Sequence, residues 1–186
     1  MSNNLPEHLG GHFNVCHIDD GILEFAIKKF KIQSLLDIGC GTGGMVEKGI
    51  EYNLDSYGID GDYELIRKNN LIDKILIHDY TCGFSGLNKK FDMVWSCEFL
   101  EHVEEKYIDN YMKDFSLGEY IFITFAPEGK IGHHHVNCRS EEYWINIFKK
   151  YNFSFDIITT LKARSHSSMA RDFFRKQGLV FINKNI

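Results

Sequence analysis

Hydrophobic and polar positions divide the chain into short apolar runs and longer amphipathic stretches. The apolar runs predict strands at residues 33–38, 56–60, 74–80, 91–98, 119–128, 153–160 and 178–184. The amphipathic stretches predict helices at residues 20–30, 45–52, 62–70, 102–115 and 140–151, while residues 163–178 have only partial helical character. Strands that alternate with helices predict an α/β fold, in which helices cover both faces of a mostly parallel sheet.

The composition fits one soluble domain over residues 1–186. The chain is 44% hydrophobic and 25% charged, and its 2 prolines mark no linker. No apolar run reaches the ~18 residues of a membrane span, and the first residues do not resemble a signal peptide. The five cysteines form no CxxC pair, which favours reduced thiols and a cytoplasmic protein. The oligomeric state stays open.

Charge is distributed unevenly around a net value of −5. From Lys149 onward there are eight basic and two acidic residues, which leaves about −11 for the rest of the chain. The overall charge argues weakly against general nucleic-acid binding. The basic end suits either a phosphorylated substrate or an ordinary solvated surface, and the second interpretation is favoured.

A glycine-rich loop follows the first predicted strand, with the sequence Gly39-Cys40-Gly41-Thr42-Gly43-Gly44. Glycine permits positive φ and lets a ligand touch the backbone, and the next helix offers free N–H groups. Other polar residues also fall at strand ends, namely Asp60, Asp79, Cys97–Glu98 and the loop 127–135. In open parallel sheets ligands bind beyond the carboxyl ends of the strands, so we expect one site there.

Two acidic residues indicate which ligand this loop holds. Asp60 ends the second strand, where a carboxylate can accept hydrogen bonds from both hydroxyls of a ribose. The spacing Gly39-x-Gly41-x-x-Gly44 also fits a dinucleotide fingerprint. That fingerprint normally has an apolar residue where this chain has Asp37, and a buried charge there needs a partner. S-adenosylmethionine would supply an ammonium group, a sulfonium group and a ribose.

The segments LLDIGCGTGG, YGID, HDY and FDMVWSCEFLEHV, taken in order, resemble the class I S-adenosylmethionine-dependent methyltransferases. The resemblance covers roughly residues 20–186. It implies a Rossmann-like three-layer sandwich whose seven-stranded sheet has an antiparallel last strand beside the fifth. It also implies cofactor contacts, and S-adenosylhomocysteine as product. The methionine end would lie against Asp37, Gly39, Cys40, Gly41 and Gly43, the ribose against Asp60 and Gly61, the adenine against Asp79 and Tyr80, and the sulfonium against Ser96 and Cys97.

The acceptor is expected near the loop that carries His133, His134 and His135. A hydroxyl acceptor must lose its proton, and histidine suits that task near neutral pH. In an extended loop His133 and His135 would share one side, which gives His134 a slight preference as the base. His102 and Glu98 are the next candidates. Metal binding by the histidines with Cys138 or His102 is a minor alternative, and simple loop polarity is another.

We therefore expect methyl transfer to an oxygen or nitrogen of a small metabolite or sugar, without a resident metal. A non-catalytic cofactor-binding partner subunit, an NAD-dependent enzyme and an RNA methyltransferase remain alternatives. The strand over residues 91–98 lacks the Asn/Asp-Pro-Pro-Tyr motif of amino-group methylases of DNA bases, so no DNA is expected. Residues 1–19, with His12, Asn14, Cys16 and His17, form either a lid over the cofactor or a docking segment.

Overall fold

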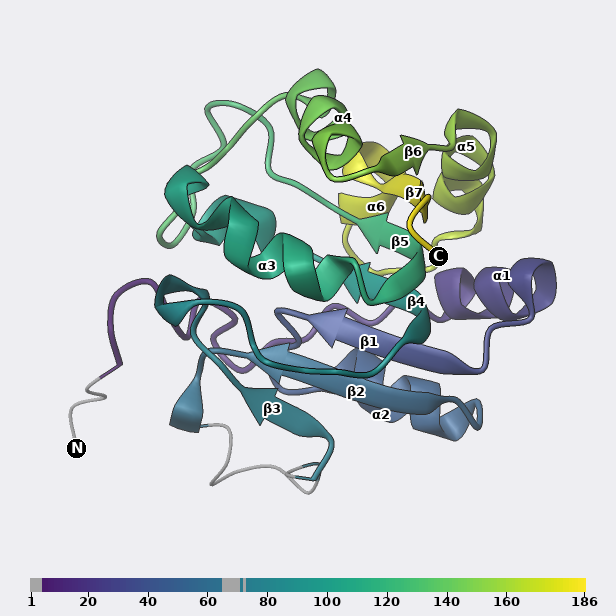
Figure 1. The fold of residues 1–186 in the computed structure, drawn as a ribbon, viewed down its shortest axis with the longest axis horizontal. Coiled ribbons are helices and arrows are strands. Elements are labelled where there is room, and N and C mark those ends of the chain that lie inside the picture. Colours follow the sequence, from purple (N-terminus) through teal and green to yellow (C-terminus); the bar gives the residue numbers. More distant parts are fainter. Residues whose placement is uncertain (1–4, 65–70, 72) are drawn as a thin grey trace.

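The computed structural model describes residues 5–64, 71 and 73–186, which form a seven-stranded sheet with helices on both faces (Figure 1). Its strands are β1 Ser34–Ile38, β2 Asp55–Asp60, β3 Ile75–Ile77, β4 Phe91–Ser96, β5 Gly118–Ile123, β6 Phe153–Phe155 and β7 Leu179–Asn183. Its α-helices are α1 Asp20–Phe30, α2 Gly44–Glu51, α3 Ile108–Phe115, α4 Glu141–Lys150, α5 Ile157–His166 and α6 Phe173–Gln177. Short 3₁₀ turns include η2 Tyr80–Cys82, η3 Leu100–His102 and η4 Glu105–Tyr107.

The strand order is β3-β2-β1-β4-β5-β7-β6, which confirms the predicted sheet. The first five strands run parallel to one another, and β7 runs antiparallel to both β5 and β6. From β1 the chain proceeds to β2 and β3 on one side and then returns to β4 on the other. This reversal of strand order opens a crevice beyond the carboxyl ends of β1 and β4, where ligands bind in such sheets.

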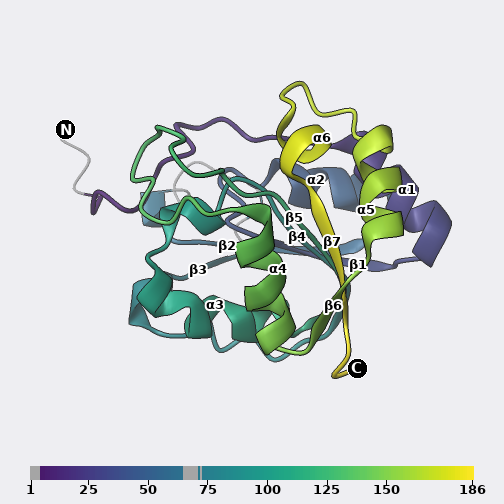
Figure 2. The same ribbon diagram turned by 90° about the horizontal axis from the view of Figure 1, so that it is seen from above.

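Alternating side chains of the strands supply two separate cores. On β1, Leu36 and Ile38 pack with α3 and α4, whereas Leu35 packs on the opposite face with α1 and α2. On β4, Val94 packs in the core with α3 and α4, and Trp95 packs in the core on the opposite face. Figure 2 shows the resulting layers, with α3 and α4 below the sheet and α1, α2, α5 and α6 above it.

Two predicted elements are corrected. The strand expected over 153–160 ends at Phe155, because Asp156 accepts a hydrogen bond from the backbone N of Thr159 and caps α5. The helix expected over 102–115 begins only at Ile108. Before it, the carbonyl oxygen of Glu101 accepts from a neighbouring loop instead of continuing a helix. Residues 65–70 of the helix expected over 62–70 lie outside the described residues.

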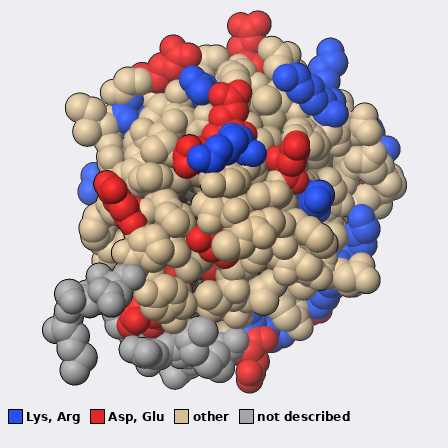
Figure 3. Space-filling model, turned by 60° about the vertical axis from the view of Figure 1, so that its left-hand side comes forward, with Lys and Arg blue, Asp and Glu red and all other residues tan. Residues whose placement is uncertain are grey.

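Acidic and basic side chains lie among one another on the face seen in Figure 3. Several basic residues near the end of the chain pair with acids, as Arg164 does with Glu141 at 2.8 Å and Lys176 with Asp172 at 3.2 Å. This pairing supports the interpretation of the basic end as a solvated surface. Among the described residues, every helix is too short or too polar to cross a membrane.

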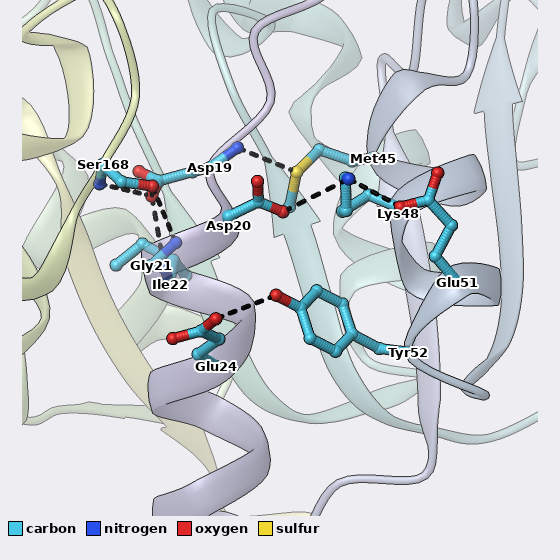
Figure 4. A network of polar contacts seen from close by, with 10 residues as sticks. All are labelled: Asp19, Asp20, Gly21, Ile22, Glu24, Met45, Lys48, Glu51, Tyr52 and Ser168. Atoms are coloured by element: carbon cyan, nitrogen blue, oxygen red, sulfur yellow. Dashed lines mark hydrogen bonds and ion pairs between the residues drawn. The ribbon is translucent and has the colours of Figure 1, made fainter.

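A polar network joins the start of α1 to α2 and to the segment around Ser168 (Figure 4). The fully buried Asp19 caps α1 by accepting from the backbone N of Ile22 at 3.2 Å, and it also accepts from the backbone N of Ser168 at 2.8 Å. Lys48 of α2 lies 3.7 Å from Asp20. Sequence-distant segments therefore meet at the point where the N-terminal segment enters α1.

Candidate functional site

A cavity of about 640 Å³ lies at the carboxyl ends of the parallel strands. It is formed by the glycine loop, the ends of β2, β3 and β4, the loop 133–135 and the N-terminal segment 8–17. Most residues proposed from the sequence line it together. These are Asp37, Gly39, Cys40, Gly41, Asp60, Gly61, Asp79, Tyr80, Cys97, Glu98, His102, His133 and His134.

The glycine loop brings the backbone to the cavity because side chains do not fit there. Gly39 has a φ of +76°, and a Cβ at this position would lie 2.6 Å from the ring of Phe99. The backbone N atoms of Gly39 and Cys40 donate to the carbonyl of Ile59, at 2.8 and 3.1 Å, and so fix the loop to β2. The loop thus presents bare main chain to the cavity.

Two carboxylates face the same end of the cavity. The Asp37 side chain is only 3% exposed, and no described residue donates a hydrogen bond to it. Burial, and then the nearby charge of Asp60, raise the pKa of Asp37 well above its usual range. Asp60 accepts from the backbone N of Gly41 at 2.7 Å and from that of Asp62 at 2.9 Å. A cationic ligand at this end of the cavity would favour the charged form of both carboxyl groups.

The N-terminal segment lines the cavity and contacts two acidic residues, of which Asp79 also lines the cavity. His8 Nε2 lies 2.9 Å from Asp79 Oδ2, and His12 Nε2 lies 3.0 Å from Asp62 Oδ2. The sequence analysis named His12 but missed His8, because a lone polar residue before the first helix carries no periodic signal. Asp79 also accepts from the backbone N of Thr81 at 2.8 Å, so both of its carboxylate oxygens have partners.

The histidine loop turns instead of extending. His134 has a φ of +45°, and all three histidines line the cavity. The expected alternation, with His134 facing away from its neighbours, is therefore wrong. His133 lies edge-on to Phe13 at 5.4 Å between ring centroids, while His135 lies 4.9 Å from His102.

Two of the proposed cofactor residues lie outside the cavity lining. Ser96 is fully buried, and its hydroxyl donates to the carbonyl of Ile38 at 2.8 Å, which joins β4 to β1. Gly43, with a φ of +83°, is the N-cap residue of α2. Both residues hold the elements that shape the cavity.

Burial changes the acid–base properties of the histidine end. Glu98 follows β4 with a φ of +52°, and its backbone N donates to the hydroxyl of Thr124 at 2.8 Å. Burial raises the pKa of Glu98. Glu101, which with His102 was expected to begin a helix in either a cap or a catalytic role, is fully buried, and its pKa is raised well above its usual range by burial and then by Glu98. Burial, and then the charge of His135, lower the pKa of His102 to about 4.

Comparisons with known proteins agree with this geometry. A family model described as a methyltransferase domain matches residues 11–117, more than half of the chain. Magnesium protoporphyrin IX methyltransferase from Synechocystis PCC 6803, solved with bound S-adenosylmethionine, has a TM-score of 0.62 at 16% identity, covering 89% of this chain and 77% of that one. The plantazolicin methyltransferase BamL gives 0.62 at 15% identity, covering 88% and 83%.

The PH0226 protein from Pyrococcus horikoshii OT3 gives a TM-score of 0.60 at 15% identity, with 89% of each chain covered. At these identities the structural likeness is one of fold. Comparison of the sequence with curated proteins gave no match. On the family match and the shared sheet order, the chain belongs to the methyltransferase domain family and is an S-adenosylmethionine-dependent methyltransferase.

Proposed function

We propose that this enzyme methylates an oxygen or nitrogen of a small metabolite or sugar. The observation that carries the proposal is one cavity with two chemically different ends. Asp37 and Asp60 lie at one end and the histidine loop at the other. Two of the matched structures are named as methyltransferases of magnesium protoporphyrin IX and of plantazolicin, which supports a small-molecule acceptor.

At the acidic end, we assign the cofactor contacts to the residues that line the cavity. Asp37 and the backbone of Gly39–Gly41 suit the ammonium group of the amino-acid portion. Asp60 has one backbone partner on each oxygen, which leaves each oxygen a lone pair for a ribose hydroxyl. Asp79 and Tyr80 are assigned to the adenine and Cys97 to the sulfonium side. The cofactor supplies an electrophilic methyl group, and its departure as a neutral thioether needs no general acid.

At the other end, His133 is the preferred general base. Its Nε2 atom is buried and has no hydrogen-bond partner among the described residues, so it is available to an acceptor proton. His134 remains the second candidate on the same loop. His102 is a weak base at neutral pH because its pKa falls to about 4, and Glu98 is placed to contact the acceptor.

The N-terminal segment is proposed to act as a lid within a single domain over residues 1–186. Residues 8–13 and 15–17 line the cavity, and they reach it through contacts such as His8–Asp79. All five cysteines are free thiols in the structure, which supports a reducing, cytoplasm-like compartment.

The test is binding followed by turnover. Isothermal titration of the isolated chain should show binding of S-adenosylmethionine and of S-adenosylhomocysteine, and no binding of NAD. A set of hydroxyl- and amine-bearing metabolites is then incubated with methyl-labelled cofactor. Tight NAD binding with no response to S-adenosylmethionine would overturn the cofactor assignment. Labelling of RNA alone would overturn the small-molecule acceptor.

A further inference from the structure

We propose that Glu101, His102 and His135 bind one divalent transition-metal cation at the acceptor end of the cavity. One ligand atom from each residue lies within 4.8 Å of the others. The first two residues belong to η3, and the third belongs to the histidine loop. That the three residues bind a cation does not depend on the proposed function. That the cation takes part in methyl transfer does depend on it.

The carboxylate of Glu101 is the observation that points to a ligand. The residue is fully buried, neither carboxylate oxygen accepts a hydrogen bond from an N–H or hydroxyl group of the described residues, and the carboxyl group of Glu98 lies beside it. Within the same described residues, no lysine or arginine forms an ion pair with Glu101 or with the neighbouring Glu98. Burying a carboxylate without a partner is costly, and a bound cation would remove that cost.

The two imidazoles are arranged as metal ligands usually are. His135 Nδ1 lies 3.0 Å from the carbonyl oxygen of Lys130. A carbonyl oxygen only accepts, so Nδ1 carries the proton and Nε2 is left with a free lone pair. Metal-bound histidines commonly donate their second N–H to such an oxygen. His102 supplies the second imidazole, and its ring lies 4.9 Å from that of His135 between centroids.

The backbone holds the two parts of the site together. The backbone N atoms of Val136 and Asn137 donate to the carbonyl oxygen of Glu101, at 2.9 and 3.0 Å. The Asn137 side chain also donates to the carbonyl oxygen of Val103 at 3.2 Å. These bonds position His135 beside η3 before any ion arrives. The same bonds use the carbonyl groups that a helix starting at His102 would have needed.

The donor set favours one group of metals. Two imidazoles and one carboxylate suit manganese, cobalt or zinc better than calcium or magnesium, which prefer oxygen ligands alone. Three protein ligands leave open positions on the cation. An acceptor hydroxyl bound there would have a lowered pKa, which would favour methyl transfer to oxygen.

The experiment titrates the EDTA-treated full-length chain with Co²⁺, followed by calorimetry and by the visible spectrum of the ion. We expect one equivalent to bind the wild type. Removing a residue that only supports a metal ligand typically weakens metal binding about 10- to 100-fold. We expect Glu101→Gln, His102→Ala and His135→Ala each to weaken Co²⁺ binding by more than that, because each removes a ligand itself. His134→Ala is the matched control, because it removes a histidine of the same loop that lies outside the three-residue group.

Two results would overturn the site. One is wild-type protein that binds no Co²⁺. The other is a pattern in which His134→Ala loses Co²⁺ binding and Glu101→Gln keeps it. That pattern would mean that the run of histidines alone captures the ion. His135 lies partly exposed on a loop, so His135→Ala is a usable variant even if Glu101→Gln does not fold. Titration of the metal-free chain with S-adenosylmethionine tests the proposed function separately. Asp37 and Asp60 are not part of the metal site, so cofactor binding should persist even if no Co²⁺ binds.

Discussion

Replacing Asp37 by Asn should move stability and cofactor affinity in opposite directions. Asp37 is only 3% exposed, and burial and the charge of Asp60 both disfavour the ionised form of its carboxyl group. Removing that charge from the cofactor-free protein should stabilise it by about 0.5–2 kcal/mol, a range typical of relieving a strained functional site. In a chain of this size that corresponds to a rise in Tm of roughly 1–8 °C.

The same change removes the proposed partner of the cofactor's ammonium group. A hydrogen bond to a charged group contributes about 1.5–3 kcal/mol, so the Kd for S-adenosylmethionine should rise roughly 10- to 150-fold. Differential scanning fluorimetry without cofactor measures the first effect, and isothermal titration measures the second. Asp55→Asn is the control, because this aspartate is half exposed, pairs with Lys89 and lies at the opposite end of β2.

The pH dependence provides an internal check. A carboxyl group whose pKa is raised in the folded state contributes stability below its unfolded pKa of 3.8, and that contribution is lost as the pH rises through the folded pKa. The Tm advantage of Asp37→Asn should therefore be small near pH 4 and largest at neutral pH. A variant that is less stable than the wild type without cofactor, or that binds the cofactor equally well, would refute the reasoning.

Three further changes test other parts of the molecule. Asp60→Ala should weaken S-adenosylmethionine binding roughly 10- to 100-fold in calorimetry. It should also lower Tm, because Asp60 accepts from the backbone of Gly41 and Asp62. Asp19→Ala should destabilise the fold by about 2 kcal/mol, through loss of a helix cap and of a buried hydrogen bond, with cofactor affinity unchanged. His133→Ala should lower turnover about 10²- to 10⁴-fold and leave the cofactor Kd as it is; normal turnover would exclude His133 as the base.

The sheet could be predicted because its signals are local. Each apolar run of the parallel strands is followed within about five residues by a glycine or an acidic residue. The strand order then follows from the family resemblance. The acidic end of the cavity could be anticipated for the same reason, since Asp37 and Asp60 mark the ends of two neighbouring strands. Parallel strands bring such ends to one edge, so spacing in the sequence becomes proximity in space.

Contacts between residues distant in sequence determine the features that could not be predicted. Periodicity over residues 102–115 favours a helix, yet the backbone of η3 is bonded to a loop more than thirty residues later, at Asn137. Glu101 is a typical surface residue by type, and only the fold shows that it is buried. Ser96 lies at the right strand end for a cofactor contact, but its hydroxyl is taken by the carbonyl of Ile38. Hydrogen-bond partners distant in sequence leave no local pattern.

The N-terminal segment is the element that touches both ends of the cavity. His8 binds Asp79 at the acidic end, and its ring also lies 6.1 Å from that of His134 at the other end. Residues 15–19 contain no helix or strand and lead directly to the buried cap of α1. A segment held by a few side-chain contacts opens at little cost, whereas the strands beneath it do not. Under the proposed assignment of Asp79 to the adenine, the cofactor competes with His8 for Asp79, so cofactor binding displaces a contact of the N-terminal segment that also bounds the acceptor end. Cofactor binding and access to the histidines are therefore expected to be coupled through this segment, without any change in the sheet.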